Sequence, residues 1–100
     1  MTVARARQTG HAVFEDLGFQ PDEGENLRLR ADLMIAITKL IERRKLTQAR
    51  AAKLLGVTQP RVSDLVRGRI DRFSIDALVR MLGRAGVRVS LSVSRARRVA

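Results

Sequence analysis

The chain has 100 residues, the usual size of one domain, and 45% of them are hydrophobic, which is enough for a folded core. It contains no cysteine, which excludes a disulfide framework and a thiolate zinc site. Lys and Arg number 20 against 10 Asp and Glu, and the formal net charge of +10 favours a polyanionic partner. No apolar run approaches the ~20 residues of a membrane span, and no signal peptide is expected.

The charge is unevenly distributed along the chain. Residues 15–25 hold five acidic residues and no basic one. Residues 43–72 hold nine basic residues and only two acidic ones, Asp64 and Asp71. This local excess of positive charge indicates a functional face in the window 43–72.

The first 24 residues show neither a helical nor a strand period. Residues 1–10 are small and basic and are predicted to form a disordered arm, with a cloning or start-site remnant as the alternative. Residues 11–24 place apolar side chains among acids, with Gly18, Pro21 and Gly24 as breakers, which indicates an irregular surface segment. The expected organisation is an arm and acidic segment over 1–24, a helical domain over 25–86, and a strand with a basic tail over 87–100.

Four helices are expected next. The first covers about 25–44, where apolar residues recur at steps of three and four: Leu33, Ile37, Leu40 and Ile41. Thr47 is a typical N-cap for a second helix ending at Leu55, and Gly56 follows as a residue able to adopt positive φ.

The third helix is expected after the N-cap Thr58. Pro60 falls in its first turn, where the missing N–H costs nothing, and Gly68 closes it. Its inward residues are expected to be Val62, Leu65 and Val66. A fourth helix, capped by Ser74, is expected to run to about residue 84.

Beyond residue 86 the period changes to two. Val87, Val89, Leu91 and Val93 alternate with polar residues, which predicts a strand over 87–93. A lone strand leaves backbone groups unpaired, so it needs a partner. Residues near 12–14 and the same strand of a second copy are both candidates.

The second and third helices are joined by the short turn 56–58, which matches the spacing of a helix-turn-helix. An ordinary helical hairpin is the alternative. The helix-turn-helix is favoured because the turn contains glycine, the surrounding window is the most basic of the chain, and the outward residues of the third helix are polar: Gln59, Arg61, Ser63, Asp64 and Arg67.

Residues 46–68, with the sequence LTQARAAKLLGVTQPRVSDLVRG, resemble the XRE family of phage-repressor and Cro-like regulators. The shared marks are LTQ at the start of the second helix, LGV in the turn, and these single positions: Ala52, Val62, Ser63, Leu65 and Gly68. The resemblance implies a mainly α fold, a four- to five-helix bundle with one C-terminal β-strand. The VFEDLGF stretch at 13–19, the long first helix, the 68–74 connection and the final strand further resemble HigA-like antitoxins.

Three residues of the third helix are predicted to face DNA bases, with a solvated surface position as the alternative for each. The Gln59 amide can donate and accept together, as an adenine edge requires, and Arg61 can fork onto guanine. Asp64 can accept from cytosine or orient Arg61 or Arg67, and the orienting role is favoured. Pro60 departs from the family pattern and can read only shape or a thymine methyl.

Other residues are predicted to contact the DNA backbone. The resemblance implies that Gln48 bridges a phosphate and Gln59, and the N–H groups at the start of the second helix also suit a phosphate. Contacts of this kind position the protein without specifying sequence. The remaining candidates are Thr47, Lys53, Thr58, Ser63, Arg67 and Arg69.

The predicted function is a sequence-specific regulator in the cytoplasm that binds a palindromic operator as a homodimer. The alternative is an antitoxin whose acidic segment blocks a small basic toxin while the protein represses its own operon. A third class, an RNA adaptor, is disfavoured because aromatic residues are only 3% of the chain. No enzymatic activity, cofactor or metal is expected, since the sequence has no cysteine nucleophile and no glycine-rich phosphate loop, and its single histidine, His11, lies in a loose segment.

Overall fold

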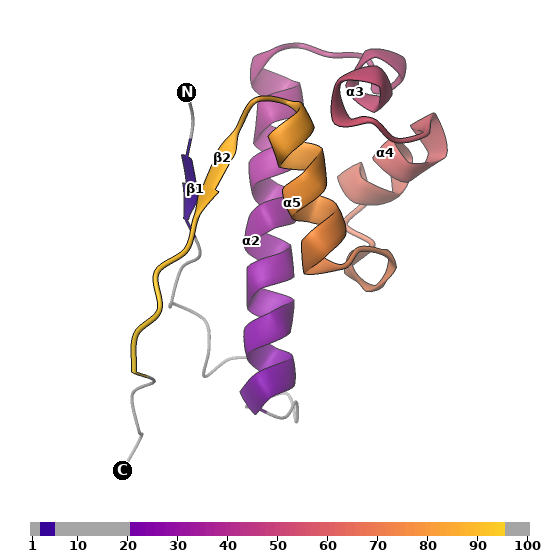
Figure 1. The fold of residues 1–100 in the computed structure, drawn as a ribbon. Helices are drawn as coiled ribbons and strands as arrows, with labels where there is room; N and C mark the ends of the chain where they lie inside the picture. The colour runs from indigo at the N-terminus through magenta and orange to yellow at the C-terminus, as the bar shows by residue number, and fades with distance from the viewer. Residues whose placement is uncertain (1–2, 6–20, 96–100) are drawn as a thin grey trace.

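The computed structural model describes residues 3–5 and 21–95, and it is mainly helical as predicted. Figure 1 shows the arrangement. The elements are β1 (Val3–Arg5), α2 (Pro21–Arg43), α3 (Gln48–Leu55), α4 (Gln59–Val66), the 3-10 helix η1 (Ile70–Arg72), α5 (Ile75–Arg84) and β2 (Arg88–Ser90). The expected VFEDLGF stretch and most of the acidic segment lie outside the described residues.

The core lies where α2 and α5 meet the two shorter helices. In Figure 1 the strands lie on one side of the α2–α5 pair, and α3 and α4 lie on the other. Aliphatic side chains dominate the interior, with Phe73 as its one aromatic residue among the buried positions. The most completely buried large side chains are Phe73, Ile37, Leu55, Leu65, Leu78, Leu82 and Val62.

Helix α2 begins at Pro21, four residues before the expected start, so the prediction of an irregular segment up to residue 24 is wrong for its last residues. Proline is tolerated in the first turn of a helix, and the acidic Asp22 and Glu23 suit the positive end of the helix dipole. Gly24, another of the expected breakers, is buried within this helix. These features offset the helix-breaking tendency on which the prediction rested.

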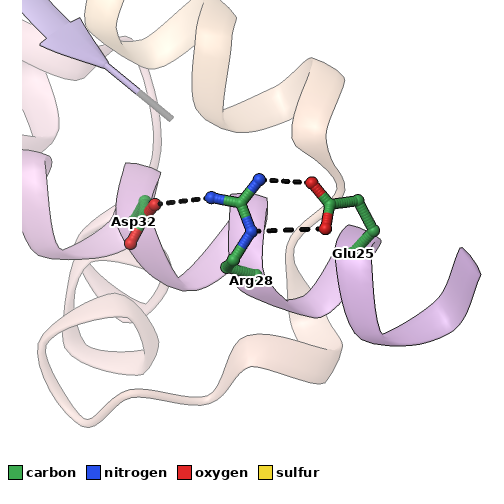
Figure 2. A network of polar contacts seen from close by, with 3 residues as sticks. All are labelled: Glu25, Arg28 and Asp32. Atoms are coloured by element: carbon green, nitrogen blue, oxygen red, sulfur yellow. Dashed lines mark hydrogen bonds and ion pairs between the residues drawn. The ribbon is translucent and has the colours of Figure 1, made fainter. Parts of the chain in front are cut away.

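A buried arginine is held within the N-terminal half of α2. The side chain of Arg28 is only 6% exposed. Its guanidinium lies between two carboxylates of the same helix (Figure 2): Nε and Nη2 donate to Glu25, and Nη1 donates to Asp32 Oδ2 at 3.5 Å. The positions three before and four after Arg28 lie on the same face of a helix, so the sequence spacing itself creates this clamp.

All four long helices end in the same way. The residue beyond each end has positive φ, and in three helices it is a glycine: Gly56, Gly68 and Gly86. Beyond the end of α2 this position is held instead by Lys45, the only described non-glycine residue with positive φ, at 52°. The following N–H donates to the backbone oxygen five residues back in each case, as Leu46 does to Ile41 at 3.0 Å.

The C-terminal strand is paired with the beginning of the chain. β1 and β2 form a two-stranded parallel sheet in which Val3 pairs with Arg88 and Arg5 with Ser90. The prediction of a disordered arm is therefore wrong for residues 3–5. It failed because a three-residue strand is too short to show a period and because its partner lies at the other end of the sequence.

Candidate nucleic-acid interface

Helix α3 is preceded by the N-cap residue Thr47 and is followed by a tight turn at Gly56. The Thr47 hydroxyl accepts a hydrogen bond from the Arg50 N–H at 3.2 Å, as an N-cap should. Gly56 has φ 71°, and the side chain of Arg84 at the end of α5 lies directly over it. Position 56 therefore favours glycine for its backbone conformation, and a β-carbon there would also displace the exposed side chain of Arg84.

Helix α4 starts after Thr58, as predicted, but the threonine side chain makes no cap hydrogen bond. Its backbone is extended, with φ −80° and ψ 158°, and its carbonyl accepts the Val62 N–H at 3.2 Å. Thr58 is exposed. Its hydroxyl is therefore available to a ligand.

The two helices pack through small and branched side chains. Ala51, Ala52 and Leu55 of α3 are buried in the same cluster as Val62 and Leu65 of α4. Alanines at the contact allow the helix backbones to approach closely. The prediction that Val66 also faces inward is wrong, because this side chain is 44% exposed.

The surface of α4 that faces away from the core is polar. At about 100° per residue, Pro60 and Arg67 lie opposite the buried pair Val62 and Leu65. Both are exposed, as is Gln59 in the first turn. Ser63 is half-buried on the same outward side.

Arg61 does not point outward with this face. Its guanidinium lies over the ring of Phe73, 4.2 Å from the centroid, and Nη1 donates to the Arg72 carbonyl at 2.8 Å. Phe73 is 2% exposed, so these contacts tie α4 to the core beside α5. The side chain predicted to reach guanine is engaged within the protein.

Asp64 is also engaged, with partners other than those expected. Its carboxylate accepts from Arg72 Nη1 at 3.2 Å, and the other oxygen lies 3.9 Å from Arg69 Nε. The expected orienting role is thus exerted on Arg69 and Arg72 in place of Arg61 or Arg67. Arg72 was not singled out by the sequence, because the seven residues that separate it from Asp64 include the end of a helix.

The predicted backbone-contact residues are exposed, except for the half-buried Ser63. Gln48 and Gln59 are each the first residue of their helix, and both are exposed. No hydrogen bond joins these two amides in the part of the chain that the structure describes. Exposure is shared by further predicted positions: Thr47, Lys53, Thr58, Arg67 and Arg69.

Residues 3–5 and 21–95 offer neither a metal site nor a membrane-spanning helix. No group of three or more His, Cys, Asp or Glu side chains there is placed to hold a metal ion. None of the helices formed by these residues is long and apolar enough to cross a membrane.

Comparison with known families places this geometry in context. The comparison with curated proteins found no match. A family model described as a helix-turn-helix domain matches residues 13–94, well over half of the chain, and so includes α3, α4 and the final strand. This match supports DNA binding. The chain belongs to this family of helix-turn-helix domains.

Proposed function

We propose that the protein is a sequence-specific transcriptional regulator of the XRE type that represses its own operon. Helix α4 enters the major groove, and the start of α3 approaches the DNA backbone. The protein acts in the cytoplasm, at the nucleoid, without a cofactor or an enzymatic reaction. It binds a palindromic operator as a homodimer, because one helix-turn-helix reads too few base pairs for useful affinity.

The observation that carries the proposal is the accessible polar face of α4 beside exposed cations. Gln59, Pro60 and Arg67 are exposed on it, Arg69 lies beside it as the ion-pair partner of Asp64, and Lys53 of α3 is a further exposed cation of the helix-turn-helix. Helix α4 itself carries one carboxylate, Asp64, which is paired with Arg69 and Arg72. A polar helix with exposed cations and a single, paired carboxylate suits the groove of a polyanion.

Within this proposal the three predicted base-reading residues have different roles. Gln59 reads an adenine edge from the start of α4. Arg61 positions α4 through its contacts with Phe73 and the Arg72 carbonyl. Asp64 orients Arg69 and Arg72 toward phosphates.

The test is binding to a labelled duplex of the gene's own upstream region, beside a scrambled duplex, at two salt concentrations. The native duplex is expected to bind on the order of 10³-fold more tightly. Gln59→Ala should reduce this preference at one base pair by about 1–3 kcal/mol. Arg61→Ala should weaken binding to both duplexes and lower the free energy of unfolding, as expected of a positioning residue.

Arg80→Ala is the matched control. The Arg80 side chain is 78% exposed and forms an ion pair with Asp76 of the same helix, so its loss should leave the preference unchanged. If both duplexes bind alike and salt removes all binding, the basic window is only an electrostatic patch and the proposal fails.

A second candidate function is that of an antitoxin of the HigA-like type. Asp22 and Glu23 are exposed on the first turn of α2, which in Figure 1 extends beyond the other helices. Such an acidic end can meet a basic, RNA-cleaving toxin. Co-expression with the product of the neighbouring gene tests this. A stable complex that Asp22→Lys with Glu23→Lys disrupts supports the role, and separate elution of the two proteins contradicts it.

A further inference from the structure

An open cleft lies between the N-terminal half of α2 and the corner formed by η1 and the start of α5. Its volume is about 430 Å³. Three arginines from three elements line it: Arg30 of α2, Arg61 of α4 and Arg72 of η1. One carboxylate, Asp71, opposes them. The cleft is therefore positively charged although it is assembled from distant parts of the sequence.

The arginines are held in place by the protein. Arg30 Nη1 donates to the Ile70 carbonyl at 3.0 Å, and its Nε donates to the Asn26 side chain at 2.7 Å. Arg61 Nη1 donates to the Arg72 carbonyl at 2.8 Å. A guanidinium has five N–H groups, so each keeps donors for a ligand. Because these side chains are already ordered, an anion binds there at a smaller entropic cost.

The cleft adjoins the recognition helix. Arg61 belongs to α4, and Arg72 donates to Asp64 of the same helix at 3.2 Å. Both of these arginines therefore keep their positions relative to α4 when it binds DNA. Arg30 is the member that brings in α2, a helix with no part in the interface described above.

We propose that this cleft binds a phosphate group, and that in the complex the group belongs to the DNA backbone next to the bases that α4 faces. Arg30 thereby extends the DNA contact surface from the helix-turn-helix to α2. The inference rests on the proposed function. An open cleft suits a polymer, since a strand can pass across it while one phosphodiester meets the fork-shaped guanidinium groups.

The first arm of the test measures Kd for the native and the scrambled duplex over a range of KCl concentrations. Arg30→Gln should weaken both duplexes by the same factor, about three- to tenfold. It should also reduce the slope of log K against log salt by about 0.9, the loss of one phosphate contact. Lys39→Gln, at an exposed position of α2 outside the cleft, should leave affinity and slope unchanged. Arg30→Lys keeps the charge and should retain the slope.

The second arm titrates inorganic phosphate into the free protein and follows the backbone amides of residues 74–77 by NMR. Saturable shifts that Arg30→Gln removes show that the cleft takes phosphate without DNA. If these appear while the salt slope of Arg30→Gln equals that of the wild type, the ligand is free phosphate and the DNA assignment is overturned. If neither arm responds to Arg30→Gln in a variant that unfolds cooperatively, the whole inference is overturned.

The proposed function can fail separately from this inference. Loss of preference for the native duplex removes sequence-specific regulation, yet a lower salt slope in Arg30→Gln on both duplexes still supports the phosphate site. Full sequence preference with no effect of Arg30→Gln on either arm supports the proposed function and overturns the phosphate site.

Discussion

The ion pairs of Arg28 with Glu25 and Asp32 contribute to the stability of the first half of α2. A guanidinium that is 6% exposed must keep its charge paired, since an unpaired buried charge is costly. Arg28→Met should lower the free energy of unfolding by about 1–3 kcal/mol, because Glu25 and Asp32 lose a shared cation. Both carboxylates are partly exposed, which keeps the loss below that of a fully buried pair. Urea unfolding followed by circular dichroism measures the change.

Lys39→Met on the same helix is the control for Arg28. Lys39 is exposed, so its substitution should change stability by no more than about 0.5 kcal/mol. Arg28→Lys should fall between the two, since an ammonium cannot bond both carboxylates as a fork does. Equal stability of the two methionine variants would show that the clamp contributes nothing.

At the same scale, the candidate site was only partly predictable from sequence. Periodicity and the Thr58 cap position correctly identified Gln59 of α4 and Arg67 just beyond it as exposed, but they wrongly turned Val66 inward. The direction of a long side chain depends on tertiary neighbours, and Arg61 finds its partner in Phe73, twelve positions away, beyond the end of its helix. Local pattern carries no information about such a contact.

At the scale of the element, Lys45 occupies a position that glycine occupies at the other helix ends. A left-handed conformation costs a residue with a β-carbon about 1–2 kcal/mol. Lys45→Gly should therefore raise the free energy of unfolding by about 0.5–1 kcal/mol, after the greater flexibility of glycine in the unfolded chain is subtracted. Denaturant unfolding tests this.

Lys45→Ala separates backbone strain from charge. It removes the same ammonium but keeps the β-carbon, so no comparable gain is expected. A glycine variant no more stable than the alanine variant would mean that position 45 carries no relievable strain.

The helix ends were predictable because their causes are local. Thr47 and Ser74 accept the N–H three residues on, and Gly56, Gly68 and Gly86 adopt positive φ, each a property of a few neighbouring residues. The start of α2 was missed because Pro21 and Gly24 also serve as breakers elsewhere. Whether such residues join a helix or interrupt it depends on their tertiary environment, which the neighbouring sequence does not specify.

At the scale of the whole molecule, the parallel pairing of β1 with β2 joins the two ends of the described chain. Val3 and Arg88 meet across more than eighty residues, and no local signal indicates such a pairing. The alternation beyond residue 86 did show that a strand needs a partner. It could not show whether that partner is the same chain or another.

We expect the proposed homodimer to form along the remaining edge of β2. In the described sheet β2 has β1 on one edge only. Val87 is buried, whereas Leu91 and Val93, on the same side of the alternation, are 69% and 87% exposed. A second copy related by two-fold symmetry can pair along this edge and cover both side chains.

Leu91→Glu combined with Val93→Glu should therefore convert the dimer to a monomer in sedimentation experiments at micromolar concentration. Like charges would face each other across the two-fold axis, and apolar area would be lost. Affinity for a palindromic duplex should fall at least tenfold, whereas binding to a single half-site should not change, because α4 is untouched. Ser92→Glu, an exposed position on the opposite side of the alternation, adds charge without opposing the partner and should remain dimeric. A wild-type chain that is monomeric both in solution and on the operator would overturn the two-fold arrangement itself, since each α4 would then read its half-site alone.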